Sequence, residues 1–263
     1  MIVHHEIKKK AQNHSANWGI LNDFESISLE KMDEVRMMKR YDSKFFISEE
    51  MLKSVLKDIT NDYFVLEIAG TKIQSYNTVY YDTPDNRFYL DHHNGYSKRM
   101  KLRKREYSDS GTVFLEVKEK NNKGETRKKR METNSLKKGL SEEETRFVKQ
   151  NTNLKGVKLE PKFNSRFKRI TLVSKRLDER CTIDIELHFN SYGAEKNDLT
   201  HMAIVELKQN QQFIRSKLAR VLKENKVYKL PFSKYCLGRA LNEEGLKNNV
   251  FKPEIQEIKN QIK

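Results

Sequence analysis

The segment from Tyr96 to Lys120 restricts the fold more than any other part of the chain. With the two-residue period of a β-strand, its first half places a row of cations on one face, Arg99, Lys101, Arg103 and Arg105. After a turn at residues 108–111, its second half has an apolar face and an opposite face with Glu116, Lys118 and Lys120. Because like charges repel across paired strands, this basic hairpin indicates a bound anion. For a single hairpin, a solvated outer face is the simpler explanation of the pattern.

The same alternation recurs in later segments, and this recurrence favours the anion. Residues 126–132, 161–172, 180–189 and 203–208 each read as a strand with an apolar face and a charged face. Their charged faces add the cations Lys128, Arg130, Arg166, Arg180 and Lys208. The helices also need an apolar surface, which the outside of a closed barrel provides. We therefore predict an α+β fold in which helices pack outside a closed β-barrel with a charged lumen.

The helical segments are recognised by apolar spacing and by capping residues. Residues 29–38 carry apolar side chains at helical spacing, and Ser48 resembles an N-cap before a helix to Ile59. A short helical turn is predicted at residues 88–90, and longer helices at 135–150, 212–225 and 236–246. We expect a polar lead-in over residues 1–23, a single domain over 24–250 and a charged tail over 251–263.

The charge balance of the chain points to polyanionic partners. The 263 residues include 52 Lys and Arg against 37 Asp and Glu, a formal net charge of +15. Such a charge attracts nucleic acid, anionic membranes, polyphosphate or nucleotides, and by itself does not choose among them. A lumen with so many cations must hold a polyanion, and carboxylates beside it suit Mg²⁺ or Mn²⁺. The chain has neither a Walker A sequence nor a G-x-G-x-x-G motif.

The location is expected to be cytoplasmic. No apolar run approaches the ~20 residues that span a bilayer, and the first residues lack the apolar core of a signal peptide. The two cysteines, Cys181 and Cys236, are too few for a disulfide framework or a four-thiolate zinc site and fit a reducing compartment.

An ordered series of short segments resembles a known family. The segments are ISLEKM, KRYDSKF, TVYYDTPDN, KLRKREY, LEVKEK, NSRF, RCTIDIEL, IVELK and PFSKY. In this order they resemble the VTC domain over about residues 24–240. That domain is the polyphosphate polymerase branch of the triphosphate tunnel metalloenzymes, a superfamily that includes CYTH-like phosphatases. The resemblance implies an eight-stranded antiparallel β tunnel and a stand-alone bacterial-type form without the SPX and membrane segments of the eukaryotic subunits.

The resemblance also implies the residues of the site. Those expected to bind triphosphate or polyphosphate are Arg40, Lys44, Lys101, Arg103, Arg105, Lys118, Lys120, Lys128, Arg130, Arg166, Arg180, Lys208, Ser233 and Lys234. Glu206 would bind the metal, Mn²⁺ or Mg²⁺, with help from Glu116. In the closing motif Pro231 stands where the eukaryotic enzymes have a lysine, a place that Lys229 would have to fill.

The activity implied by the resemblance is transfer of the γ-phosphate of ATP to a growing polyphosphate chain, without a protein nucleophile. ATP and polyphosphate are the expected partners, with no specific nucleic acid and no membrane span, and a separate membrane partner is left open. Two alternatives remain: a triphosphatase or nucleoside triphosphate hydrolase of the same tunnel fold, and a non-catalytic module that binds polyanions or RNA. The RNA alternative is weaker because Met100, Leu102 and Val117, rather than aromatic residues, interleave the basic strands.

Overall fold

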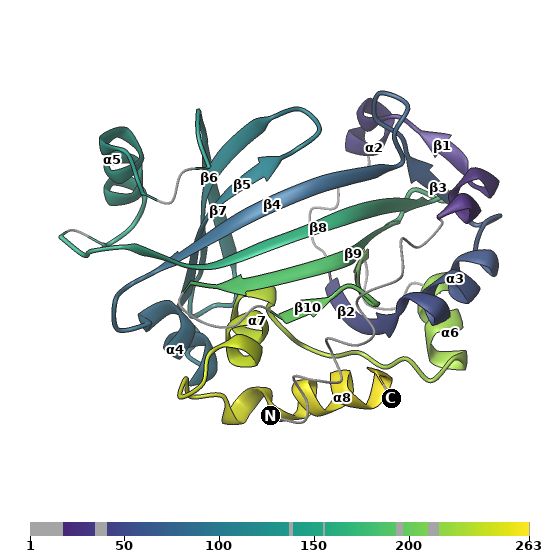
Figure 1. Ribbon diagram of the computed structural model, residues 1–263. Helices are drawn as coiled ribbons and strands as arrows, with labels where there is room; N and C mark the ends of the chain where they lie inside the picture. Colours follow the sequence, from purple (N-terminus) through teal and green to yellow (C-terminus); the bar gives the residue numbers. More distant parts are fainter. Residues whose placement is uncertain are drawn as a thin grey trace.

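The computed structural model describes residues 18–34, 41–136, 139–154, 156–192, 197–209 and 216–262, and one large sheet dominates it (Figure 1). The main path of this sheet has the strand order β2 (Tyr41–Ser48), β11 (Met202–Gln209), β9 (Glu179–Ser191), β8 (Glu160–Ser174), β4 (Ile73–Asp82), β5 (Arg99–Tyr107), β6 (Thr112–Lys120) and β7 (Thr126–Thr133). Every neighbouring pair along this path is antiparallel. The predicted antiparallel α+β architecture is therefore confirmed.

Three short strands extend the sheet at its margins. Strand β3 (Tyr63–Leu66) pairs with β8 and, in parallel, with β1 (Glu25–Ile27), while β10 (Asn197–Leu199) pairs with β9. Helix α2 (Leu29–Glu34) follows β1, and the rest of the helix predicted to residue 38 lies outside the described residues.

The sheet is strongly curved, and the part of it that the structure describes does not close on itself. Lys118 on β6 lies close enough to Glu206 on β11 for their charges to interact, although four strands separate β6 from β11 in the sheet. We call the side of the sheet that carries Lys118 and Glu206 the concave face. Within the described residues, the end strands β2 and β7 do not pair with each other. Closure into a complete barrel therefore stays a prediction.

Helices cover one part of the convex side of the sheet. Helix α3 (Glu49–Lys57) begins where the Ser48 side chain accepts a hydrogen bond from the Met51 amide at 3.2 Å, as its capping pattern predicted. It packs with α6 (Lys217–Glu224) and the 3₁₀ helix η1 (Gly19–Asp23). Apolar side chains from β2, β8, β9 and β11 complete this core.

A second helix covers the convex side of β5 and β6. Helix α5 (Glu142–Asn151) begins at Ser141, which forms a capping box with Glu144. Lys104, only 1% exposed, donates to the Gly139 carbonyl at 2.8 Å and pairs with Glu144 at 2.8 Å. This buried ion pair fixes the start of α5 over the hairpin.

Helix α7 (Lys234–Asn242) lies against the concave face instead, which corrects the expectation that all helices pack outside (Figure 1). The reason is the apolar end of this face, where Tyr235 stacks on Tyr80 with ring centroids 5.3 Å apart. The Tyr235 hydroxyl donates to Asp82 at 2.6 Å, and a Cβ at Gly238 would lie 2.1 Å from the Phe163 ring. Helix α7 therefore fills one end of the concavity.

The core reaches into both predicted tails. Trp18 and Leu21, in the predicted lead-in, are buried in the convex-side core. Near the other end, Phe251 lies in the 3₁₀ helix η2 (Asn249–Phe251) and Ile258 lies in α8 (Lys252–Ile262). Both side chains are buried against α4 (Arg87–His93) and α7. Residues 1–17 lie outside the described part. None of the helices described here has the length and apolarity to cross a membrane.

Candidate functional site

The hairpin of β5 and β6 places its cations on the concave face. Paired positions on this face are Lys101 with Lys118, Arg103 with Glu116, and Arg105 with Phe114. Side chains at paired positions project from the same side of a sheet, so the predicted row of charges exists. Strand β7 adds two more cations: Lys128 opposite Lys118 and Arg130 opposite Glu116. Lys120, at the end of β6, is paired with Arg99.

The second half of the site comes from β2, β11 and β9. On this side the register aligns Lys44 with Glu206, and Lys208 with Arg180. The Lys208 ammonium lies 3.3 Å from a Glu206 carboxylate oxygen. Burial would raise the pKa of Glu206, but Lys208, Lys44 and Arg169 lower it to about 2. Glu206 is therefore an ionised carboxylate in a cationic surrounding.

The two residues just before α7 join the two halves. Lys101 on β5 donates to the Ser233 hydroxyl at 2.9 Å, and Lys44 on β2 donates to the Phe232 carbonyl at 3.1 Å. Burial lowers the pKa of Lys101 to about 8, and the nearby Lys44 adds to this shift. Lys118 is accessible to water, yet desolvation and the neighbouring Lys101 lower its pKa to about 8 as well. The site thus holds ammonium groups whose charge is disfavoured without an anion.

Glu116 is held by two cations. Its Oε2 accepts from Arg103 Nε at 2.6 Å and lies 2.6 Å from Arg103 Nη2, and its Oε1 pairs with Lys128. Burial would raise the pKa of Glu116, but Arg103, Arg105 and Lys128 lower it to about 2. The geometry fixes the Arg103 guanidinium through Glu116.

Asp184 on β9 is held in the same way by residues from two other elements. Arg169 on β8 donates to both its oxygens, at 2.6 and 2.9 Å, and Lys234 on α7 pairs with Oδ2. The Lys234 ammonium also lies 3.7 Å from the centre of the Phe167 ring. The family resemblance predicted Lys234 but not Arg169 or Asp184, although the period of two counted from Phe167 points Arg169 to the concave face.

Arg105 differs from Arg103 and Arg169, the two arginines of this face that are held by carboxylates. It is 8% exposed, and its Nε donates to the Thr78 hydroxyl at 3.3 Å. No carboxylate among the described residues forms an ion pair with it. Burial and the neighbouring Arg103 lower its pKa to about 10. Its guanidinium, unlike those of Arg103 and Arg169, is therefore not engaged by a carboxylate and can pair with an anion.

One predicted ligand is not brought to this face, and another lies outside the described residues. Arg166 is paired with Asn77, is exposed, and points to the opposite side of β8 from Phe167 and Arg169. It lines a small pocket with Lys168 and His188. Arg40 lies outside the described residues. The other predicted ligands on the main strands and at the start of α7 occupy the concave side.

The carboxylates of this face show which residue suits a metal. The described residues contain no group of three or more His, Cys, Asp or Glu side chains that would hold a metal by themselves. Mg²⁺ is commonly held by one or two carboxylates together with substrate phosphates and water. Glu206, with one lysine at 3.3 Å, fits such a role, whereas the oxygens of Glu116 and Asp184 are taken up by Arg and Lys.

The comparisons with known proteins agree with this fold. A family model described as the VTC domain matches residues 39–242. No curated protein matches the sequence of this chain. Among solved structures, the chain is similar to an adenylyl cyclase candidate from Hippeastrum with a dominant triphosphatase activity, at 13% identity and a TM-score of 0.50 over 80% of this chain and 99% of that chain. It is also similar to an adenylate cyclase candidate from Vibrio parahaemolyticus, at 12% identity and a TM-score of 0.42 over 76% of this chain and 97% of that chain.

Proposed function

The chain belongs to the VTC domain family, and from this we propose that it is a metal-dependent polyphosphate polymerase, which transfers the γ-phosphate of ATP to a growing polyphosphate chain. The observation that carries the proposal is the concave face, where Glu206 is ionised and where, among the described residues, Lys101, Arg105 and Lys118 form no ion pair with a carboxylate. Burying such an array of cations costs free energy when no ligand is bound, and its density of positive charge matches the density of negative charge along linked phosphates.

The chain's own residues would act by binding and orienting. Arg103 and Arg169, held by Glu116 and Asp184, offer guanidinium groups of fixed direction to phosphate oxygens. Arg105 adds a positive charge close by, which stabilises the negative charge that the transferring phosphoryl group carries. Phosphoryl transfer between two phosphates requires no protein nucleophile, and we assign none.

Glu206 would hold the divalent cation, Mn²⁺ or Mg²⁺. When bound, such an ion would supply positive charge that neutralises the phosphate oxygens. The sequence-based hypothesis placed Glu116 at the metal as well. Because Arg103 and Lys128 engage its two oxygens, we propose instead that Glu116 positions Arg103.

A second candidate activity is hydrolysis of triphosphates in the same site. It is favoured by the fold shared with the Hippeastrum protein, whose dominant activity is that of a triphosphatase. The same cations would bind the substrate, and water would replace the phosphate chain as acceptor.

Product analysis tests the proposal and separates the two activities. The full chain is incubated with ATP and Mn²⁺ or Mg²⁺, and ADP, free phosphate and polymer are measured, the last on a gel stained for polyphosphate. We expect a ladder of long polymer with a matching amount of ADP, absent in Glu206→Gln. Free phosphate without polymer would replace the polymerase by the hydrolase, and no product with either metal would refute both.

A further inference from the structure

One end of the β5–β6 hairpin carries only cations on the concave face. The two residue pairs nearest the turn at residues 121–125 are cations on both strands: Arg99 with Lys120, and Lys101 with Lys118. The next pair, Arg103 with Glu116, already contains a carboxylate. Residues that share a face of a strand follow each other at about 6.7 Å, so Arg99 lies about 13 Å along β5 from Arg103. The positive charge of the concave face therefore continues well beyond the Arg103 guanidinium.

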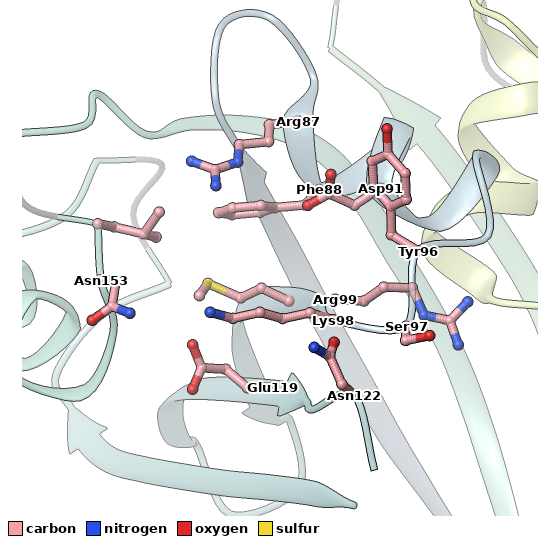
Figure 2. A pocket seen from close by; sticks show the side chains of 12 residues that line it. Arg87, Phe88, Asp91, Tyr96, Ser97, Lys98, Arg99, Glu119, Asn122 and Asn153 are labelled. Atoms are coloured by element: carbon pink, nitrogen blue, oxygen red, sulfur yellow. The ribbon is translucent and has the colours of Figure 1, made fainter. Parts of the chain in front are cut away.

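The side chain of Arg99 is directed towards this row of cations. Arg99 lines the pocket drawn in Figure 2, but its guanidinium lies at the opposite end from the Lys98 ammonium and the Glu119 carboxylate. Burial, and to a smaller extent the charges of Lys101 and Arg99, lower the pKa of His92 on α4 to about 3. Arg99 and Lys101 are therefore close to each other, and His92 adds a neutral ring beside them.

The outermost pair has no acid to neutralise it. Among the described residues, neither Arg99 nor Lys120 forms a side-chain hydrogen bond or an ion pair. The Glu125 carboxylate of the adjoining turn accepts a hydrogen bond from the Asn121 amide at 2.8 Å instead. Because both cations are half-buried and directly paired across two strands, they repel each other unless an anion lies between them.

A chain of linked phosphates suits this end of the face, because every unit of the chain carries negative charge. We propose that Arg99 and Lys120 extend the phosphate site and hold the polyphosphate chain several units away from the transferring group. Long chains are then retained better than short ones, since tripolyphosphate in the transfer site does not reach both Arg103 and Arg99. The inference rests on the proposed function, which assigns the concave face to phosphates.

Calorimetry with two ligands, tripolyphosphate and a long polyphosphate of one chain length, tests the extension without metal. We expect Arg99→Gln with Lys120→Gln to lower the ratio of the long-chain affinity to the tripolyphosphate affinity about fivefold or more. The logarithm of the long-chain affinity should also depend less steeply on the logarithm of salt concentration, by about one unit of slope for each lost phosphate contact.

Lys98→Gln with Lys129→Gln is the matched control, because it removes the same two charges from neighbouring positions on the other side of the hairpin. Lys98 directly precedes Arg99 and is turned the opposite way (Figure 2). Lys129 is paired with Val117, which faces the convex-side core. This control should keep the affinity ratio of the wild type, although it lowers the net charge equally.

Two results would overturn the inference while tripolyphosphate still binds. They are an unchanged affinity ratio in Arg99→Gln with Lys120→Gln, and an equal fall of the ratio in the control, which would reduce the effect to overall charge. If the wild type bound neither ligand, the extension and the proposed function would both be refuted. The binding measurements thus separate failure of the extension from failure of the proposed function, without an assay of turnover.

Discussion

At the scale of single residues, the carboxylates of the concave face divide into two kinds by their partners. Glu116 and Asp184 each have an arginine and a lysine on their oxygens, whereas Glu206 has one lysine at 3.3 Å. The lowered pKa values of all three show that they are ionised at neutral pH, so the difference lies in what occupies their oxygens. Two of them hold arginines in place, and the third can accept a metal.

Glu206→Gln and Glu116→Gln should therefore have opposite profiles. We expect Glu206→Gln to reduce metal-dependent turnover by about 100-fold or more, because losses outside the ligand shell already cost about 10–100-fold. Its binding of tripolyphosphate without metal should not weaken, since a repelling carboxylate is removed. Glu116→Gln should weaken metal-free binding about tenfold, because Arg103 loses its fixed orientation.

Calorimetry without metal and turnover as a function of metal concentration measure the two profiles. Glu50→Gln on the surface helix α3 is the matched control, and thermal unfolding checks that each variant is folded. If Glu116→Gln changed the metal requirement and Glu206→Gln did not, the two assignments would be reversed.

The lysines of the site predict a pH dependence. The pKa values of Lys101 and Lys118 are lowered to about 8 from an ordinary value of 10.5, so the protein without ligand loses these charges as the pH rises from 7 to 9. A bound polyanion favours the charged forms. Tripolyphosphate binding should therefore weaken across this range and take up protons near pH 8. Calorimetry in two buffers of different ionisation enthalpy measures the uptake, and its absence at pH 8 would contradict the lowered pKa values.

The same shifts affect stability in the opposite direction. Because the fold disfavours the charged lysines, their cost is full below about pH 8 and is relieved as the pH rises towards 10.5. Without ligand, this pair should therefore contribute a gain in the free energy of unfolding over that range.

At the scale of elements, α7 determines what the concave face can bind. Its N-terminal residues Ser233 and Lys234 contact Lys101 and Asp184, while its middle packs on apolar rings. Gly238 allows this approach because any Cβ there would meet the fully buried Phe163 ring. The position of the phosphate-facing residues thus depends on close packing one turn further along the helix.

Gly238→Ala tests this dependence. The added methyl group has no room, and overpacking of this kind costs about 1–3 kcal/mol. We expect a lower free energy of unfolding and weaker tripolyphosphate binding, measured by denaturant titration and calorimetry. Gly139→Ala is the control, because nothing lies within 4 Å of the Cβ that it adds. Unchanged stability in Gly238→Ala would show that α7 is not packed against β8 as described.

Helix α7 also explains why the side of β8 that faces the site could not be predicted from the sequence. Alternation in residues 99–105 and 114–120 correctly predicted the shared charged face, since neighbouring strands of a hairpin fix each other's phase. In β8 the concave face is apolar at Phe163 and Phe167, because it packs on α7. Arg166 therefore falls on the outer side, and Arg169 takes the position on the concave side. Periodicity gives the phase of a strand, but which face is concave depends on distant packing.

At the scale of the whole molecule, the net charge is +15, and the curvature of one sheet brings many of its cations together on the concave face. Cations from β2, β5, β6, β7 and β11 share the concave side, so long polyphosphate should displace many counterions on binding. We expect its affinity to fall steeply with added salt, much more than that of a single phosphate. A flat dependence between about 50 and 200 mM salt, measured by calorimetry, would contradict binding to a multi-phosphate array.

The most direct test of the central claim compares two arginines on opposite faces of the sheet. Arg105 lies buried on the concave side without a carboxylate partner, and Arg166 is exposed on the other side. Calorimetry with tripolyphosphate should show that Arg105→Ala weakens binding about tenfold or more, whereas Arg166→Ala stays close to the wild type. Weakening by Arg166→Ala with no effect of Arg105→Ala would place the phosphate site outside the concave face.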